Sequence, residues 1–180
     1  MRMRAFLGTA VTLPLLVSSV SAGPDKVAFP EGYQTHFVRY TTIDKPERKP
    51  PIVRFMYVNP EALAAAQADQ PAPQGTVLIM EDHKAQLDAD GKAMTDSRGR
   101  FIPTNDLTNV FVMEKQPGWG AEYSPEQRNG EWEYAWYQPN GARKVGDFVK
   151  FERCFACHKD NVEGQDYNFT FAPFVAEMKP

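Results

Sequence analysis

The distribution of apolar residues along the chain predicts several short strands rather than long helices. Residues 35–42 and 52–58 are rich in β-branched and aromatic side chains, and both stretches are predicted strands. Residues 76–81, 109–113 and 132–137 form three more apolar stretches of strand length. Proline and glycine occur densely along the chain, which limits the length of each element. The pattern therefore predicts short strands that pair in antiparallel fashion.

One helix is predicted directly after the second strand. Asn59 is suited to cap it, Pro60 fits its first turn, and Glu61 interacts favourably with its dipole. An alanine-rich run continues the helix to Gln67, and Pro71 prevents a further extension.

Two Asp-rich segments between the third and fourth strands predict turns. Residues 88–91 read Asp-Ala-Asp-Gly, and residues 96–99 read Asp-Ser-Arg-Gly. A calcium loop of the EF-hand type would need regularly spaced ligands and a closing Glu, which these segments lack. We therefore predict hairpin turns here rather than a calcium site.

The start of the chain has a different pattern from the rest. Arg2 and Arg4 precede an apolar run at residues 5–17, which is too short to span a membrane. Residues 20–22, Val-Ser-Ala, fit a cleavage site with small residues. We therefore predict a signal peptide at residues 1–22, a single domain at residues 23–180 and export to the periplasm. An uncleaved membrane anchor is the alternative.

Composition and charge exclude several classes of protein. The chain is 42% hydrophobic and 24% charged, which is ordinary for a globular domain and excludes disorder. Removal of a leader with two Arg and no acidic residue changes the formal net charge from −3 to −5. The basic residues form no stripe, and the Pro-rich run at residues 45–51 carries mixed charge. We therefore expect no nucleic-acid partner, and no membrane association after cleavage.

The decisive motif lies near the C-terminal end and reads Cys-Phe-Ala-Cys-His at residues 154–158. The spacing C-x-x-C-H is the attachment sequence for c-type haem. Cys154 and Cys157 add to the two vinyl groups of one porphyrin, and His158 is then held below the iron as an axial ligand. The motif uses both cysteines of the chain. Attachment takes place outside the cytoplasm, which agrees with the predicted export.

Three other uses of a cysteine pair compete with haem attachment. A thioredoxin-like redox pair would follow an early strand of a βαβ unit, whereas this pair lies late in the chain. A structural zinc site would need a fourth ligand, which His36 or His83 would have to supply. An exported protein can also hold a simple disulfide. The adjacent His and the export signal favour haem.

Further segments carry a family resemblance when they are taken in order. They read Phe-Pro-Glu-Gly-Tyr at residues 29–33, Arg-Phe-Met-Tyr-Val-Asn-Pro-Glu at 54–61, Gly-Thr-Val-Leu-Ile-Met-Glu at 75–81 and Gly-Trp-Gly at 118–120. Together with the C-terminal motif they resemble the cytochrome P-460 family, which includes the cytochromes c′-beta. The resemblance implies an α+β, mainly β domain. Its antiparallel sheet would carry a few short helices and one covalent haem c, and the protein would be a homodimer.

The chain departs from the hydroxylamine-oxidising members of this family at two positions. Those enzymes carry a Lys that is cross-linked to the porphyrin, and alignment from Gly75 places Met80 there. Lys84 lies four residues further on and is not assumed to replace it. The enzymes also place a carboxylate in the distal pocket, where Val110 is the nearest equivalent. Both departures argue against hydroxylamine oxidation.

Met80 and Arg54 are the remaining candidates on the distal side of the haem. The resemblance implies that Met80 points at the haem, where its thioether would be a second iron ligand; core packing is the alternative. His36 and His83 are alternative ligands. Arg54 would orient a bound ligand or neutralise a haem propionate, with a surface salt bridge as the alternative.

The three tryptophans, at 119, 132 and 136, are expected in the core or against the porphyrin.

These residues leave three functions open. The first is electron transfer with His/Met ligation, which needs a redox partner protein. The second is a five-coordinate cytochrome that binds a diatomic gas such as nitric oxide. The third and least favoured is an oxidoreductase acting on hydroxylamine or nitric oxide.

Overall fold

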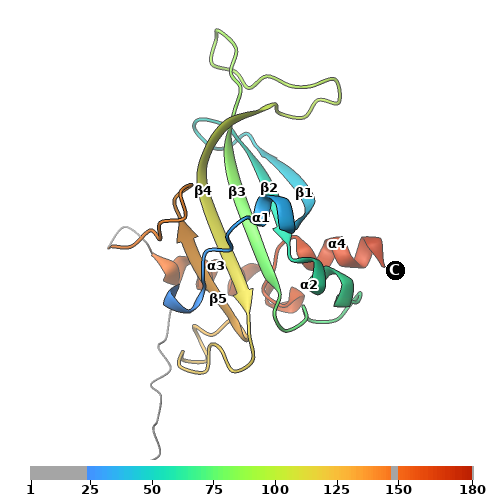
Figure 1. The fold of residues 1–180 in the computed structure, drawn as a ribbon, viewed down its shortest axis with the longest axis vertical. Helices are drawn as coiled ribbons and strands as arrows, with labels where there is room; N and C mark the ends of the chain where they lie inside the picture. Colours follow the sequence, from blue (N-terminus) through green and yellow to red (C-terminus); the bar gives the residue numbers. More distant parts are fainter. Residues whose placement is uncertain (1–23, 147–149, 180) are drawn as a thin grey trace, which may run out of the picture.

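A single antiparallel sheet forms the centre of the protein (Figure 1). The computed structural model describes residues 24–146 and 150–179, so the predicted signal peptide lies outside the described residues. Five strands pair in the order of the sequence, each antiparallel to the next. This confirms the predicted mainly β fold. The strands are β1 (Val38–Lys45), β2 (Ile52–Val58), β3 (Val77–Ala85), β4 (Pro103–Lys115) and β5 (Trp132–Tyr137).

Short helices cover the two faces of this sheet. They are η1 (Pro24–Lys26), α1 (Tyr33–His36), α2 (Pro60–Ala65), α3 (Phe151–Val162), η2 (Glu163–Gln165) and α4 (Phe171–Met178). The helices α2, α3 and α4 pack on one face, and α1 with the segment after η1 packs on the other. No helix in the part of the chain that the structure describes is long and apolar enough to cross a membrane.

Alternation along the strands creates two hydrophobic cores. The core below α3 and α4 contains Met56, Leu78, Met113 and Trp132. The core on the opposite face is built from the neighbouring positions, such as Ile79. Successive strand residues point to opposite faces, so each apolar strand supplies both cores.

The first strand begins later than the sequence predicts. Helix α1 covers residues 33–36 and so includes the first two residues of the predicted strand 35–42. Gly32 adopts the left-handed region with φ of 69°, and its carbonyl accepts the N–H groups of Thr35 and His36. The chain therefore makes one helical turn before β1, which then runs on to Lys45.

The predicted hairpin turns between β3 and β4 are confirmed. The Oδ1 atom of Asp88 accepts the N–H groups of Asp90 and Lys92 at 3.0 and 2.9 Å. Asp96 makes the same pair of bonds to residues 98 and 100. Isolated bridges then pair residue 87 with 93 and residue 95 with 101. The carboxyl groups thus stabilise the turns in this connection between β3 and β4, which rises above the sheet in Figure 1.

The helix predicted after β2 is present but ends at Ala65 rather than Gln67. Asn59 does not cap it with its side chain, because the Oδ1 atom of Asn59 accepts the N–H of Val77 at 2.8 Å. At the other end, Lys179 Nζ donates to the carbonyls of residues 63, 64 and 66. A lysine from the end of α4 therefore satisfies the last carbonyls of α2.

Candidate functional site

A cavity of about 710 Å³ lies between the sheet and α3. Its volume falls within the ~300–1,000 Å³ that is usual for small-molecule and cofactor sites. The structure places all five sequence-predicted site residues on its lining: Arg54 on β2, Met80 on β3, and Cys154, Cys157 and His158 on α3.

Helix α3 holds the two thiols and the imidazole on one side. Residues three and four apart share a helix face, so Cys154, Cys157 and His158 project together. Both thiols are free in the described structure; Cys154 is half-buried and Cys157 is exposed. Burial and the neighbouring Cys157 raise the pKa of the Cys154 thiol. Phe155 points into the core against Tyr134, with ring centroids 4.8 Å apart, and anchors the helix there.

The imidazole of His158 is oriented by a backbone carbonyl. Its Nδ1 atom lies 2.5 Å from the carbonyl oxygen of Tyr167, so Nδ1–H donates and Nε2 is left for a metal. Burial lowers the pKa of His158, and the bond to Tyr167 offsets part of this effect. The imidazole is therefore neutral at neutral pH, which is the form that binds iron. Rings of Tyr134 and Phe169 enclose it, with centroids 4.9 and 5.0 Å away.

The sheet side of the cavity is an apolar wall around Met80. Met80 pairs with Met56 on β2 and with Phe111 on β4. Phe111 stacks on Trp136 with centroids 5.1 Å apart and planes 20° apart. All four side chains line the cavity. Soft thioethers and aromatic rings thus face the side of the cavity where α3 presents its imidazole.

Arg54 forms an ion pair, but the pair is not on the surface. Arg54 and Asp82 are register partners on β2 and β3, and the guanidinium binds the carboxylate twice, at 2.7 and 2.9 Å. Their side chains are only 13% and 6% exposed. The surface salt bridge considered from the sequence is therefore corrected to a largely buried, bidentate pair. Because Arg54 lines the cavity, its guanidinium is available for the predicted role beside a haem.

Three further cations lie on the cavity and were not singled out by the sequence. They are Lys45 on β1, and Lys150 and Arg153 at the start of α3. No Asp or Glu lines the cavity within the described residues. Two of these cations directly precede the C-x-x-C-H motif in the sequence, which is the signal that could have found them. Cations beside an apolar cavity suit a flat apolar group with acidic substituents, such as haem with its propionates.

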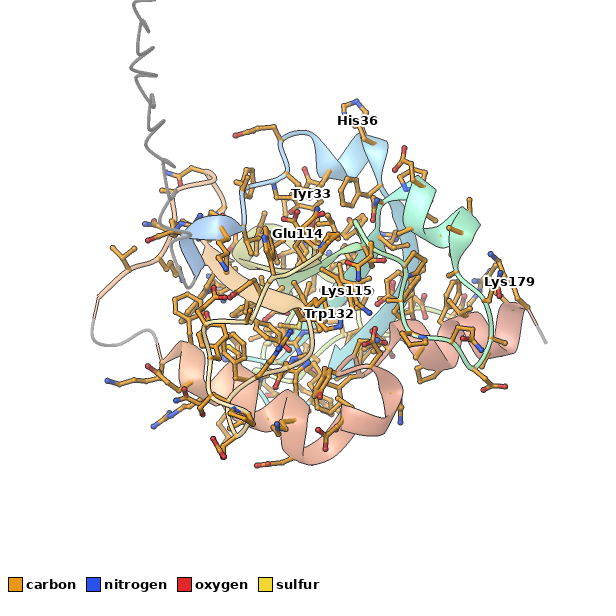
Figure 2. The ribbon with its side chains drawn as sticks, turned by 90° about the horizontal axis from the view of Figure 1, so that it is seen from below. Tyr33, His36, Glu114, Lys115, Trp132 and Lys179 are labelled. Carbon is orange, nitrogen blue, oxygen red and sulfur yellow. The ribbon has the colours of Figure 1, made fainter. Side chains whose placement is uncertain are left out.

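The alternative histidine ligands lie away from this cavity. His83 is on the opposite face of β3, where Nε2 contacts Glu81 and Nδ1 lies 3.1 Å from the Thr104 carbonyl oxygen. His36 is exposed on α1, at the rim of the molecule (Figure 2). Among residues 24–146 and 150–179 there is no cluster of three His, Cys, Asp or Glu that could hold a metal ion. The geometry gives the zinc alternative no support.

Two other sequence expectations are refined by the strand register. Val110 is fully buried in the opposite core, so it is not the distal-pocket position of β4. Phe111 is the residue that lines the cavity, because neighbouring residues on a strand point to opposite faces. Trp132 is in the core, Trp119 packs against the opposite core, and Trp136 lines the cavity.

Together, the residues of this cavity fit a covalently attached haem. Two thiols and one neutral imidazole share a helix face, the walls are apolar, and cations are at hand for two propionates. No other site in the described part of the chain offers this set of donors.

Comparison with known families gives an independent result. The family model described as Cytochrome P460 matches residues 30–170. This span includes the whole sheet, all of α3 and the turn that carries Tyr167. Comparison with curated proteins finds no match.

Proposed function

The chain belongs to the cytochrome P460 family, and from this premise we propose that it is an exported, periplasmic monohaem c-type cytochrome that transfers electrons. Cys154 and Cys157 would hold one haem through thioether bonds, with His158 and Met80 as its axial ligands. The observation that carries the proposal is the shared cavity, which His158 lines from α3 and Met80 lines from the sheet. A redox partner protein and a homodimeric state complete the proposal.

The protein's own residues each have a defined task in this function. When bound, the haem supplies one-electron chemistry through its iron. The Tyr167 carbonyl keeps His158 in the tautomer whose Nε2 can bind metal. Phe111, Trp136 and the methionines exclude water from the cavity. Asp82 holds the Arg54 guanidinium in a fixed position, so that Arg54 can interact with a propionate without a further loss of its side-chain entropy.

A five-coordinate gas-binding protein is the second candidate, and the apolar wall favours it. A small uncharged molecule such as nitric oxide needs no charged partner, and the stacked Phe111 and Trp136 offer an apolar distal surface. Hydroxylamine oxidation has less support. Met80 cannot form the lysine cross-link, and no carboxylate among the described residues lines the cavity to move protons.

The two candidates are separated by comparing the haem-loaded wild type with the haem-loaded Met80→Ala variant. We expect the mature protein, produced with a cytochrome c maturation system, to gain one haem mass that survives acid–acetone extraction. We expect a low-spin ferrous spectrum in the wild type and a mainly high-spin one in Met80→Ala. Carbon monoxide should bind the variant quickly and the wild type only after displacement of the sulfur.

Met56→Ala is the matched control, because Met56 pairs directly with Met80 and lines the same cavity. It should cost roughly 2–5 kcal/mol of stability as a core truncation while leaving the spin state unchanged. A high-spin ferrous wild type would discard Met80 ligation and promote the gas-binding function. Haem that is lost on extraction would contradict both candidates.

A further inference from the structure

A buried ion pair lies next to the turn that orients His158. Lys115 is the last residue of β4, and its side chain is only 8% exposed. Its Nζ atom donates to Asp166 Oδ2 at 2.9 Å and to the Ala72 carbonyl at 3.0 Å. The same carboxylate oxygen accepts the N–H of Ala72 at 2.8 Å. Figure 2 shows Lys115 in the interior beside Trp132, its register partner on β5.

The backbone at Asp166 adopts a conformation that needs support. Asp166 and Tyr167 are consecutive non-glycine residues with φ of 51° and 59°. This left-handed region is disfavoured for side-chain-bearing residues, so the surrounding contacts must hold it. The Asp166 side chain is held by Lys115 and Ala72, and the Asp166 carbonyl accepts from Asn168 at 3.2 Å. The turn is thus fixed on both sides.

This turn positions the carbonyl group of Tyr167. Tyr167 directly follows Asp166, and its carbonyl oxygen lies 2.5 Å from His158 Nδ1. A hydrogen bond at Nδ1 makes an imidazole more electron-donating toward a metal at Nε2. A donating imidazole stabilises ferric iron relative to ferrous iron and therefore lowers the reduction potential.

We propose that the Lys115–Asp166 pair is a positioning device that sets the reduction potential through the Tyr167 carbonyl and His158. This proposal rests on the haem-binding function proposed above. The pair acts at a distance, because neither Lys115 nor Asp166 lines the haem cavity. Its effect passes from the ion pair to the left-handed turn, from the turn to the carbonyl, and from the carbonyl to the imidazole.

Two variants of the haem-loaded protein test the proposal by the sign of their effect. Lys115→Met removes the donor, and Asp166→Asn removes the charge while keeping a residue that tolerates the left-handed conformation. If the pair acts by positioning, both variants loosen the carbonyl and both move the potential upward. If the two charges act only through space, loss of the cation lowers the potential and loss of the anion raises it.

The measurement is spectroelectrochemical titration of the purified holoprotein. We expect Lys115→Met to shift the ferric-to-ferrous ratio about tenfold, which is about 59 mV for a one-electron couple. Asp166→Asn should shift it less, in the same direction, and Lys115→Arg should restore most of the wild-type value. Shifts of opposite sign, or no shift in either variant, would overturn the proposal.

Lys26→Met is the matched control for lost stability. The Lys26 side chain is also 8% exposed and pairs with acidic residues, but it serves the opposite face of the sheet. It should lower the melting temperature without moving the potential. If Lys115→Met fails to fold, Lys115→Gln takes its place: it also removes the cation, so an upward shift of the potential supports positioning and a downward shift supports an effect through space alone. Absence of attached haem in the wild type would contradict the proposed function itself, and is recognised before any titration.

Discussion

The carboxyl group of Glu133 is buried, and the described residues give a hydrogen bond to only one of its two oxygens. It has no exposed surface, and its Oε2 atom accepts the O–H of Tyr123 at 2.9 Å. Its Oε1 atom has no hydrogen-bond partner among the described residues, and Lys26 Nζ is 3.9 Å away. Burial raises the pKa of Glu133 above the usual 4.5, although Tyr123 and Lys26 oppose the shift.

This shift predicts the direction of a pH effect on stability. Between pH 4.5 and the raised pKa of folded Glu133, the folded state holds a proton that the unfolded state has released, so the stability that Glu133 contributes falls as pH rises through this window. Glu133→Gln removes this titration. We expect the free energy of unfolding of the variant, relative to wild type, to increase from pH 4 to pH 7 in urea denaturation. A difference that stays constant, or decreases, would show that the buried carboxyl does not titrate as described.

Among individual residues, the sequence alone points to the candidate haem-attachment motif more clearly than to the buried ion pairs. The motif at residues 154–158 is visible because its five residues are contiguous. The ion pair of Lys115 with Asp166 joins residues 51 positions apart, and Arg54 finds Asp82 only through strand register. Neither contact can be read before the order of the strands is known.

Among the elements, β4 shows how strand parity decides what a residue can do. Val110 lies in the core opposite the cavity, whereas Phe111 lines the cavity. We expect Val110→Glu to lower the free energy of unfolding by about 3–5 kcal/mol, because it buries an unpaired charge. Phe111→Glu should cost less, since its carboxylate faces the cavity and the cations there. Urea denaturation of the two variants measures this; equal losses would place both residues in comparable surroundings.

The sequence predicts the bounds of a strand well where the whole strand is one continuous apolar run. Strands β2 and β5 match their predicted bounds because each is a continuous apolar and aromatic run. Strand β4 is longer than its apolar part, since the polar residues from Pro103 onward also pair with β3. Helix α1 was missed because Gly32 starts a turn whose residues have strand propensity. Tertiary pairing and a single left-handed residue overrode local preference in these two places.

For the whole molecule, the predicted export can be tested at the cleavage site. Cleavage sites require small residues at positions −3 and −1 but tolerate others at −2. We expect intact mass to show a mature chain that begins at Gly23, with the protein in the periplasmic fraction. Ala22→Tyr should block processing and leave more than about half of the protein with the membrane, because the leader stays attached. Ser21→Tyr, one residue away, is the control and should be processed normally; equal processing of both would contradict the assigned site.

The order of elements along the chain has a consequence for assembly of the holoprotein. Every strand pairs with its neighbour in sequence, so the sheet can grow by short-range steps as the chain folds. Helix α3 emerges only after all five strands, and it meets a sheet whose apolar face is ready to receive it. Once docked, α3 half-buries Cys154 while Cys157 remains open to solvent. In the proposed haem-loaded protein, docking of α3 would therefore compete in time with thioether formation at Cys154, and a maturation enzyme would have to reach the helix before it closes on the sheet.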